Sequence, residues 1–496
     1  EAERGAQRLR FDEALATQLT MAYRRADAAS RPAQPRVRVS GGLLDAFDER
    51  LPFRLTGGQA EVSSAILDDL ARPRPMQRLL QGEVGSGKTV VALRAMLAVV
   101  DAGGQAALLA PTEVLASQHF QTIRELLGDL GGGRMLGAPD VATDVVLLTG
   151  SMTAAARKSA LLRAASGEAG IVIGTHALLA ERVQFADLGL IVVDEQHRFG
   201  VEQRAVLADK ASSRPHVLVL TATPIPRSVA MTIFGDLDVS TLAELPAGRA
   251  DVATVVVDAA ARPQWVQRAW DRVLEEVAAG RQVFVVVPRI ASSAEGKGVV
   301  ELADELRSGP LADVRVGVLH GQLPGDAKDE AMGAFATGDL DVLVATTVIE
   351  VGVDVPNASM MVVWDADRFG ISQLHQLRGR IGRGSHPGVC LLVTSVPDGE
   401  PARVRLDAVA STRDGFELAE LDLEQRREGD VLGATQAGSR SSLRLLRVLE
   451  HADLIARARE LAAECVARDP DLTTPGFADA IRATEMLASP DWLERN

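Results

Sequence analysis

The chain has 496 residues, a formal net charge of −14 at pH 7 and a sequence pI near 5.2, which excludes non-specific coating of nucleic acid by its whole surface. Hydrophobic residues make up 47% and charged residues 24%, as in globular proteins, and the length allows roughly three domains of about 150 residues. Aromatic residues make up only 3%, so a base-stacking platform is not the expected means of binding nucleic acid, whereas a local basic groove is compatible with the composition.

No segment is typical of membrane insertion, secretion or disulfide stabilisation. The longest apolar runs, such as Val283 to Val287, are far too short to cross a bilayer, and residues 1–30 lack the apolar core of a signal peptide. Two cysteines, Cys390 and Cys465, are too few for a disulfide framework and do not form a metal-site pattern. We therefore expect a cytoplasmic protein without a membrane partner.

Residues 1–45 predict a helix followed by a linker. Phe11, Leu15, Leu19 and Met21 follow helical spacing, and a proline-punctuated stretch comes after them. Two interpretations stay open: a solvated helix with its linker, or a helix that joins the chain to a preceding domain. The chain begins with a glutamate rather than a methionine, which is compatible with the second.

The next part of the chain predicts two successive α/β domains, because strand-like apolar runs alternate with helical segments. In residues 46–247 the expected strands of a parallel sheet lie at 78–81, 106–110, 145–148, 171–174, 189–193 and 217–221. In residues 248–400 they lie near 254–257, 282–287, 315–319, 341–345, 360–364 and 388–394. A linker that starts at Pro246 separates the two series, and residues 401–496 read as helical.

A phosphate-loop pattern, GxxxxGK(S/T), follows the first expected strand and precedes a helical run. Its three glycines let the backbone turn N–H groups toward a polyphosphate at the positive end of that helix. Lys88 can reach the β- and γ-phosphates, and Thr89 can offer its hydroxyl to Mg²⁺. The sequence therefore predicts a nucleoside triphosphate bound by Gly82, Gly85, Ser86, Gly87, Lys88 and Thr89.

An acidic pair, Asp194 and Glu195, follows the buried-strand run at 188–193, where open α/β sheets place ligands. Asp194 can hold Mg²⁺ through water, and Glu195 can orient and deprotonate the attacking water. Such a pair alone often caps a helix, but the phosphate loop in the same sheet favours catalysis. Further polar residues can sense the γ-phosphate or act as a switch beneath the nucleotide: Gln196, His197, Thr221 and Thr223.

In the second half, the stretch QLRGRIGR starts at Gln376 and places Arg380 and Arg383 three residues apart, on one face of the expected helix. An arginine that contacts a γ-phosphate neutralises charge in the transition state and raises the rate of hydrolysis by a factor of roughly 10³–10⁵. Arginines at this spacing are usually solvated. Flanking glycines and the lack of acidic neighbours favour a catalytic role here.

The order of these motifs resembles that of superfamily 2 helicases, and longer stretches resemble the RecG family of ATP-dependent branched-DNA helicases. The resemblance covers roughly residues 45–440 and rests on the stretches at 51–59, 194–204, 221–227, 346–384 and 411–438. It implies two RecA-like domains in tandem, an N-terminal helical linker and a C-terminal helical translocation element. It also implies ATP hydrolysis with Mg²⁺ and movement on double-stranded DNA at stalled forks and Holliday junctions in recombination and repair.

The resemblance implies roles for single residues. Gln59 matches the glutamine that reads adenine, Gly352 and Asp354 lie in a motif that couples nucleotide to DNA, and Arg380 and Arg383 match arginine fingers. Residues in motifs that contact DNA or couple hydrolysis to movement are Thr112, Thr175, His197, Thr221, Thr223, His320, Thr347, Arg426, Asp430 and Gln436.

Two departures from the family are visible. Arg427 and Glu428 stand where the family commonly has Gly-Pro, which puts the turn inside the translocation motif in question. The family also has an N-terminal oligonucleotide-fold wedge, and residues 1–45 are too short to form one. If the chain were complete, we would expect DNA-dependent ATPase activity that is poorly coupled to branch migration.

Three alternatives stay open. A transcription–repair coupling factor shares the translocation motif but usually has DEEH where Gln196 stands, and an RNA helicase lacks an element like 411–438. A nucleotide-switched DNA-binding scaffold with little motor activity is the alternative from another class. The expected partner is branched double-stranded DNA, a single-strand-binding protein is a second candidate, and we expect a monomer.

Overall fold

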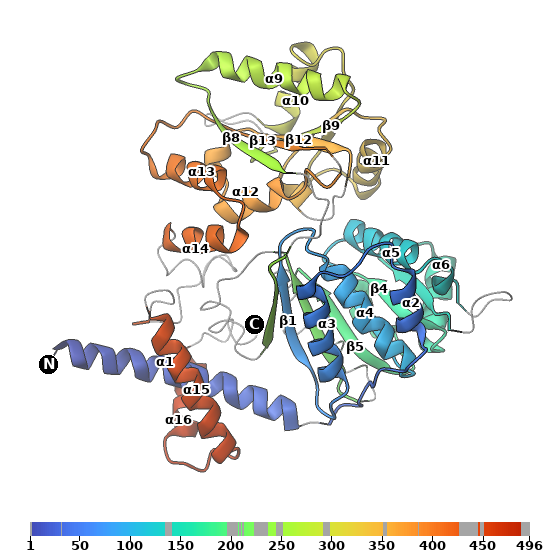
Figure 1. The fold of residues 1–496 in the computed structure, drawn as a ribbon, viewed down its shortest axis with the longest axis vertical. Coiled ribbons are helices and arrows are strands. Elements are labelled where there is room, and N and C mark those ends of the chain that lie inside the picture. Colours follow the sequence, from blue (N-terminus) through green and yellow to red (C-terminus); the bar gives the residue numbers. More distant parts are fainter. Residues whose placement is uncertain are drawn as a thin grey trace. The chain divides into compact units, whose positions relative to one another are not determined.

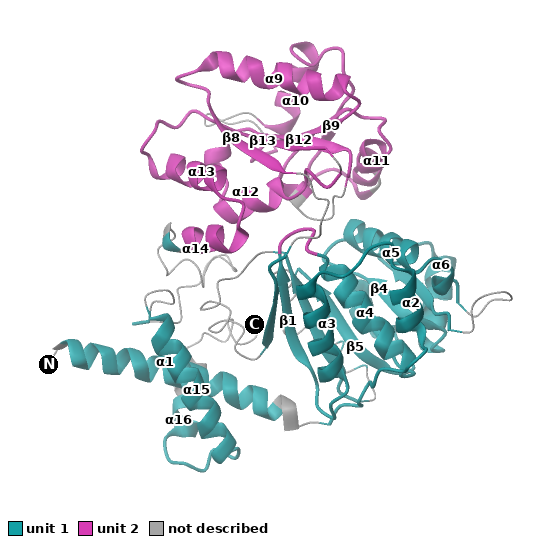
Figure 2. Cartoon of the chain, in the orientation of Figure 1, with its two compact units in different colours: residues 1–82, 87–244, 423–496 teal, residues 83–86, 245–422 magenta. Residues whose placement is uncertain are grey.

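The computed structural model describes residues 2–30, 32–133, 141–195, 207, 210, 213–222, 237–244, 251–290, 298–350, 355–384, 386–425, 445–446 and 451–487. The chain forms two compact units (Figure 2). The first comprises Glu1–Gly82, Gly87–Glu244 and Leu423–Asn496, and the second comprises Glu83–Ser86 and Leu245–Asp422. The predicted C-terminal region, 401–496, is therefore divided between the two units.

The sheet of the first unit has seven strands in the order β3-β4-β2-β5-β6-β1-β7, and its neighbouring strands pair in parallel. The strands are β1 (Gln77–Gly82), β2 (Gln105–Leu109), β3 (Asp144–Leu148), β4 (Ala169–Gly174), β5 (Leu188–Asp194), β6 (His216–Thr221) and β7 (Asp238–Leu242). The first six confirm the predicted strands. The edge strand β7 was not predicted, because its sequence, DVSTL, has no apolar run.

Helices cover both faces of this sheet (Figure 1). They are α2 (Leu43–Arg50), α3 (Gly57–Leu70), α4 (Lys88–Asp101), α5 (Glu113–Leu127) and α6 (Ala154–Ala165), with the short 3₁₀ helices η1 (Gly128–Gly131) and η2 (His176–Leu179). In β5, Leu190 and Val192 pack on one face and Ile191 and Val193 on the other, so both faces carry a core. Every residue of α4 from Val90 to Val99 is buried, which holds the helix behind the phosphate loop rigidly.

Three helices of the first unit come from opposite ends of the chain: α1 (Ala2–Ser30), α15 (Ala452–Arg468) and α16 (Phe477–Leu487) (Figure 1). Leu19 of α1 packs with Val466 and Ile481, and Leu15 lies against the same cluster. The carboxylate of Glu13 accepts hydrogen bonds from the backbone N–H groups of residues 445 and 446, both at 2.9 Å. The helical stripe was correct, but the interpretation of a solvated helix was wrong, because its apolar face is covered by the C-terminal helices.

The sheet of the second unit has six strands in the order β10-β11-β9-β12-β13-β8, again paired in parallel. The strands are β8 (Val252–Asp258), β9 (Gln282–Val286), β10 (Val316–Leu319), β11 (Val342–Ala345), β12 (Ala358–Val363) and β13 (Gly388–Thr394), all at predicted positions. One face packs on α9 (Pro263–Ala278) and α10 (Val299–Ser308), and the other on α11 (Gly325–Ala336), α12 (Ile371–Arg378) and α13 (Pro401–Ser411). The 3₁₀ helices η4 (Thr347–Glu350) and η5 (Ala366–Arg368) and the helix α14 (Gly415–Gln425), which belongs to this unit as far as Asp422, complete the unit's described elements.

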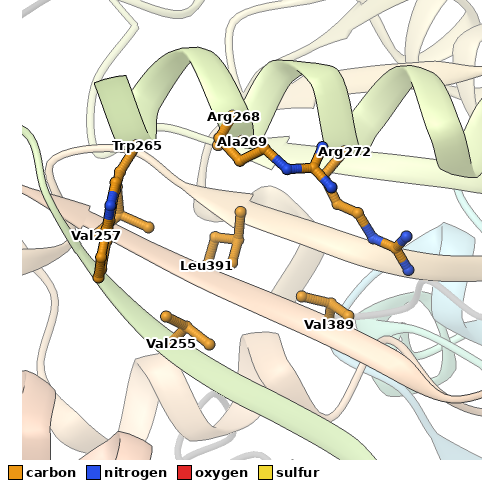
Figure 3. Close-up of a pocket in the computed structure, with 8 residues that line it drawn as sticks. All are labelled: Val255, Val257, Trp265, Arg268, Ala269, Arg272, Val389 and Leu391. Carbon is orange, nitrogen blue, oxygen red and sulfur yellow. The ribbon is translucent and has the colours of Figure 1, made fainter. Parts of the chain in front are cut away.

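An apolar groove of about 290 Å³ lies between α9 and the strands β8 and β13 (Figure 3). Arg268 and Arg272 line it, but each donates to the carboxylate of Glu275 at 2.8 Å. Because these guanidinium groups already have a carboxylate partner, the groove is not a prepared phosphate site. None of the predicted site residues lines it.

Candidate functional site

The phosphate loop turns between β1 and α4 through two left-handed glycines. Gly85 and Gly87 both have φ near +85°, a conformation that L side chains rarely adopt. Gly87 is the N-cap of α4, so Lys88 is the first helical residue, and the positive end of the helix dipole lies at the loop. The Lys88 ammonium donates to the carbonyl of Gly82 at 2.6 Å, across the loop. The predicted phosphate cradle is thus present as a backbone shape.

Gln59 lies against this loop from the start of α3. It forms a capping box with Thr56: its backbone N–H donates to the threonine hydroxyl at 3.2 Å, and its Oε1 accepts from the Thr56 N–H at 3.0 Å. A Cβ on Gly87 would come within 2.2 Å of Gln59 Nε2, so the amide and the loop are in close contact. Recognition of adenine by Gln59 stays a prediction.

The acidic pair stands where the sequence predicted it, at the carboxyl end of β5. Asp194 and Glu195 are only 9% and 8% exposed. Glu195 has φ of +55°, which is uncommon for a residue other than glycine and is often found at functional sites. Its N–H donates to the carbonyl of Leu220 at 3.0 Å, next to Thr221 at the end of β6. The turn that presents the glutamate is therefore tied to the neighbouring strand.

A residue that sequence reasoning missed, His119 of α5, contacts the acidic pair. Its Nε2 lies 2.7 Å from Asp194 Oδ2, and the histidine is buried. Burial acts to raise the pKa of Asp194, but the hydrogen bond from His119 and the charge of Lys88 outweigh it and hold that pKa below its usual value. A signal existed: α5 follows β2, and β2 is the direct neighbour of β5, so a polar residue on α5 can reach the end of that strand.

Oxygen donors suited to a hard cation are present in the first unit. Asp194 is held as a carboxylate, and Thr89, a half-exposed residue, lies in the first turn of α4. Among the described residues, no group of three or more His, Cys, Asp or Glu side chains could hold a metal. The donor set fits a cation bound partly by phosphate oxygens and water, as Mg²⁺ commonly is.

The predicted DNA-contacting residues of the first unit act as helix caps. Thr112 accepts from the Leu115 N–H at 3.2 Å and starts α5, and Thr175 accepts from the Ala177 N–H at 3.4 Å and starts η2. They follow the neighbouring strands β2 and β4, and each hydroxyl still has a proton to donate. Thr175 is only 1% exposed.

The second unit repeats this placement. His320 follows β10, and Thr347 begins η4 after β11, the direct neighbour of β10. The two residues therefore stand at adjacent strand ends, as Thr112 and Thr175 do in the first unit. Their role in DNA binding stays a prediction.

The predicted arginine fingers do not lie on a helix face. Gln376 is within α12, but the helix ends at Arg378 with Gly379 as its C-cap, so Arg380 and Arg383 lie in the following turn. Gly382 has φ of +69°, which a continuing helix would not allow. The expectation of one helical face was wrong, because the glycines of the motif end the helix. Arg380 is 9% exposed, and Arg383 Nε donates to the Gly379 carbonyl at 3.3 Å.

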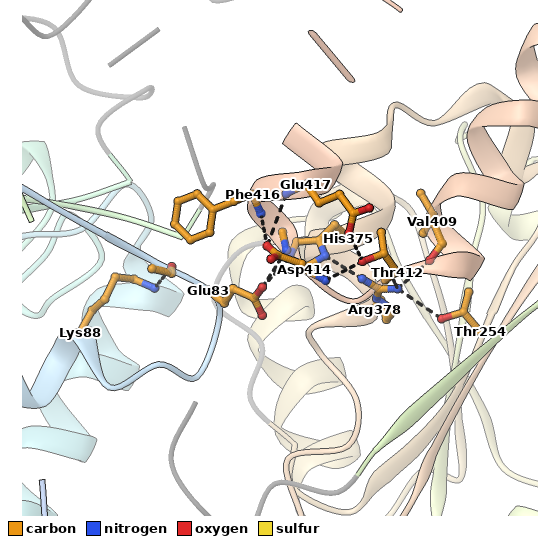
Figure 4. A network of polar contacts seen from close by, with 12 residues as sticks. Glu83, Lys88, Thr254, His375, Arg378, Val409, Thr412, Asp414, Phe416 and Glu417 are labelled. Atoms are coloured by element: carbon orange, nitrogen blue, oxygen red, sulfur yellow. Dashed lines mark hydrogen bonds and ion pairs between the residues drawn. The ribbon is translucent and has the colours of Figure 1, made fainter. Parts of the chain in front are cut away.

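Another arginine of the same motif, Arg378, has a structural role (Figure 4). Its Nη1 donates to the carbonyls of Val409 and Thr412 at 2.7 and 2.8 Å, and its Nη2 lies 2.9 Å from His375 Nδ1. Burial lowers the pKa of this guanidinium. The side chain fixes the end of α12 to the end of α13, just before the turn that carries Arg380 and Arg383.

Seven predicted residues lie outside the described residues: His197, Thr223, Gly352, Asp354, Arg426, Asp430 and Gln436. Gln196 and the two departures, Arg427 and Glu428, lie outside them as well. In the described part of the chain, no helix is long and apolar enough to cross a membrane.

Comparisons with known families match most of the chain. The model of the DEAD/DEAH box helicase matches residues 56–232, and the helicase conserved C-terminal domain matches residues 266–385. A third model, described as ATP-dependent DNA helicase RecG, domain 3, C-terminal, matches residues 412–487. These matches confirm the tandem RecA-like helicase domains.

Similar proteins and structures agree. ATP-dependent DNA helicase RecG of Mycobacterium tuberculosis is 56% identical over 98% of this chain and 67% of its own length. The Bacillus subtilis protein of that name is 42% identical over 97% of this chain and 68% of its own length. A structure of RecG bound to a three-way DNA junction has a TM-score of 0.74 and 38% identity, covering 93% of this chain and 57% of that one. Mss116p bound to single-stranded RNA and AMP-PNP, at 16% identity and a TM-score of 0.57, shares the fold.

The chain thus spans about two thirds of these relatives' length and 57% of the solved chain. Identity over nearly the whole chain, the two helicase domains and the RecG-specific third region all agree. The phosphate loop and the acidic pair stand in the same sheet, as a nucleotide-hydrolysing motor requires. The chain belongs to the RecG family of ATP-dependent DNA helicases.

Proposed function

We propose that this chain is an ATP-driven motor that moves on double-stranded DNA at branch points such as stalled forks and Holliday junctions, in recombination and repair. The RecG relatives are named ATP-dependent DNA helicases, and one RecG structure is described as bound to a three-way DNA junction. We extend both properties to this chain on the basis of family membership.

The observation that supports the hydrolytic part best is that Lys88 and His119 both act on Asp194. A lysine that can reach phosphates and an ionised carboxylate at the end of a strand in the same sheet are the parts used for phosphoryl transfer in P-loop enzymes. Thr89 and Asp194 would hold Mg²⁺, which when bound supplies neutralisation of phosphate charge. Mg²⁺ is therefore part of the proposal.

The chain's own residues would then carry separate tasks. Lys88 would bind the β- and γ-phosphates, and Glu195 would accept a proton from the attacking water at its carboxylate. Arg380 and Arg383 would neutralise the charge that develops on the γ-phosphate. Thr112 would donate its hydroxyl proton to a DNA phosphate while its oxygen still caps α5.

Binding of DNA by a chain with a net charge of −14 requires local contacts. The association constant for DNA should then fall as salt rises. For each duplex phosphate that the chain neutralises, a tenfold rise in salt concentration should lower its logarithm by about 0.9. We further propose a monomer in a cytoplasmic setting, with a single-strand-binding protein as a candidate partner.

One assay tests the proposal: the ATPase rate of this chain with linear, forked and four-way DNA at matched concentrations. We expect the branched substrates to stimulate hydrolysis more than linear duplex does. Binding of forked DNA without stimulated turnover would favour the nucleotide-switched scaffold instead. Equal stimulation by single-stranded RNA and by forked DNA would contradict the assignment to branched DNA.

A further inference from the structure

We infer that His119 is a positioning residue for ATP hydrolysis: it holds the Asp194 carboxylate and links that carboxylate to α5, the helix that begins at Thr112. The inference deepens the proposed function and rests on it, because Asp194 is taken as the metal-holding carboxylate and Thr112 as a DNA-contacting residue. No sequence motif singled out His119. The contact joins His119 to Asp194, a residue 75 positions further along the chain.

The contact itself is short and buried. Nε2 of His119 and Oδ2 of Asp194 are 2.7 Å apart, and the two residues are 8% and 9% exposed. A hydrogen bond at one carboxylate oxygen restricts rotation of the short aspartate side chain and so fixes where its charge points. Residues that orient metal-holding groups in this way commonly change metal affinity or activity by about 10–100-fold when removed.

The helix that carries His119 can transmit a displacement. His119 lies seven residues after Thr112, which corresponds to two turns and about 10.5 Å along the axis. Between and beyond them, Ala116, Ile123 and Leu127 are buried in the core of the sheet, so α5 moves as a unit rather than bending locally. A DNA strand that binds the Thr112 hydroxyl and displaces α5 would therefore also shift the His119 imidazole and the Asp194 carboxylate.

A purely structural role for His119 makes different predictions. If the imidazole only fills space, a leucine of similar size should serve equally well. If the N–H donor matters, leucine should fail and glutamine, whose Nε2 can reach a similar position, should largely restore function. Gln121, exposed on the same helix, offers a matched control because its side chain lies away from the core.

The first measurement is metal binding rather than activity. Mn²⁺ affinity in the presence of ADP, followed by the electron paramagnetic resonance of free Mn²⁺, is compared for the wild type, His119→Leu, His119→Gln and Gln121→Leu. We expect a loss of about tenfold or more for His119→Leu, most of it restored in His119→Gln, and none for Gln121→Leu. Thermal melting is run in parallel to confirm that all variants fold. Wild-type Mn²⁺ affinity in a folded His119→Leu would overturn the inference.

The second measurement tests the link to DNA. The ratio of ATPase rates with and without forked DNA is compared at saturating Mg²⁺, so that weaker metal binding does not mask the result. We expect this ratio to fall severalfold in His119→Leu and to be retained in Gln121→Leu. An unchanged ratio in His119→Leu would overturn the link. If forked DNA does not stimulate the ATPase rate of the wild type, the proposed function is wrong. The link between His119 and DNA depends on that function and is then wrong as well. The role of His119 toward Asp194 is judged separately, by the Mn²⁺ affinities.

Discussion

The two units have the same kind of sheet but carry charges of opposite sign in different loops: at the carboxyl ends of the strands in the first unit and at the amino ends of β12 and β13 in the second. In the first unit, β5 ends in the acidic pair Asp194–Glu195. In the second, the turn after α12 carries the basic residues Arg380 and Arg383. Parallel sheets place loops at both ends of their strands whatever their sequence, so the architecture supplies the positions and the loop residues supply the chemistry.

Each unit also contains a buried basic side chain that forms hydrogen bonds with backbone groups. In the first, His216 begins β6; its Nδ1 accepts from the Met76 N–H at 3.0 Å, and its Nε2 lies 3.2 Å from the Gln34 carbonyl. In the second, the Arg378 guanidinium donates to the carbonyls of Val409 and Thr412. Burial lowers the pKa of both groups, but only histidine, whose ordinary value is near neutrality, loses its charge as a result.

The largest expected effect is on the ATPase rate and comes from a change at Arg383, in the turn after α12. Arg383→Ala should retain ATP binding and lower the DNA-stimulated ATPase rate by roughly 10³–10⁵, because the charge on the γ-phosphate is no longer neutralised in the transition state. The rate is measured with saturating ATP and forked DNA. Wild-type hydrolysis by this variant would show that the arginine-finger assignment is wrong.

Substitutions of Glu195 and Lys88 in the first unit should have different effects on ATP binding and on ATP hydrolysis. Glu195→Gln should bind ATP normally and lose roughly 10²–10⁴ in rate, since the amide cannot accept the proton from water. Lys88→Ala should instead weaken ATP binding itself, because the phosphates lose their cationic contact. Equilibrium binding of a fluorescent ATP analogue beside steady-state rates distinguishes the two. A Glu195→Gln enzyme with full turnover would exclude Glu195 as the base.

A stability effect should follow from the buried arginine of the second unit. Arg378→Leu removes the donor from one buried and one partly buried carbonyl and should destabilise that unit by about 2–4 kcal/mol. Denaturant unfolding gives the value, and Arg405→Leu, which removes one donor to the Asp367 carbonyl at 3.0 Å, is the control with a smaller expected loss. Equal stability of Arg378→Leu and the wild type would mean that water replaces the guanidinium at both carbonyls.

The smallest effect concerns pH and the first unit. Burial keeps the folded pKa of His216 below its unfolded value near 6.5, so as pH falls through 6.5 only the unfolded chain takes up the proton. Stability should therefore decrease below pH 6.5, by at most about 1.4 kcal/mol per pH unit from this residue. Unfolding of the wild type and His216→Gln at pH 8 and pH 5 measures the difference. An identical pH dependence in both proteins would assign the effect to other groups.

Much of the fold was readable from the sequence, because buried parallel strands are continuous apolar runs and the phosphate loop is a contiguous pattern. Twelve expected strands are present, and β7 was missed because its alternating polar residues lie at a sheet edge. Asp194 and Glu195 could be identified because they stand at a strand end in the chain, and Lys88 because it has a fixed place in the phosphate-loop pattern. Arg380 and Arg383 were identified as candidates, but their helical placement was wrong, since glycine geometry overrode the i, i+3 spacing.

By itself the sequence determined the local parts: the tandem parallel sheets, the glycine turn that cradles phosphate, and the strand that ends in two carboxylates. Only the tertiary structure decided which distant residues meet these parts. His119 reaches Asp194 because β2 pairs with β5, and Leu15 and Leu19 of α1 are covered because α15 and α16 pack on them. Helices, strands and turns are determined largely by residues that are close in the sequence, so they can be predicted from it. Strand order and helix packing bring together residues that are far apart in the sequence, and no sequence spacing predicts those contacts.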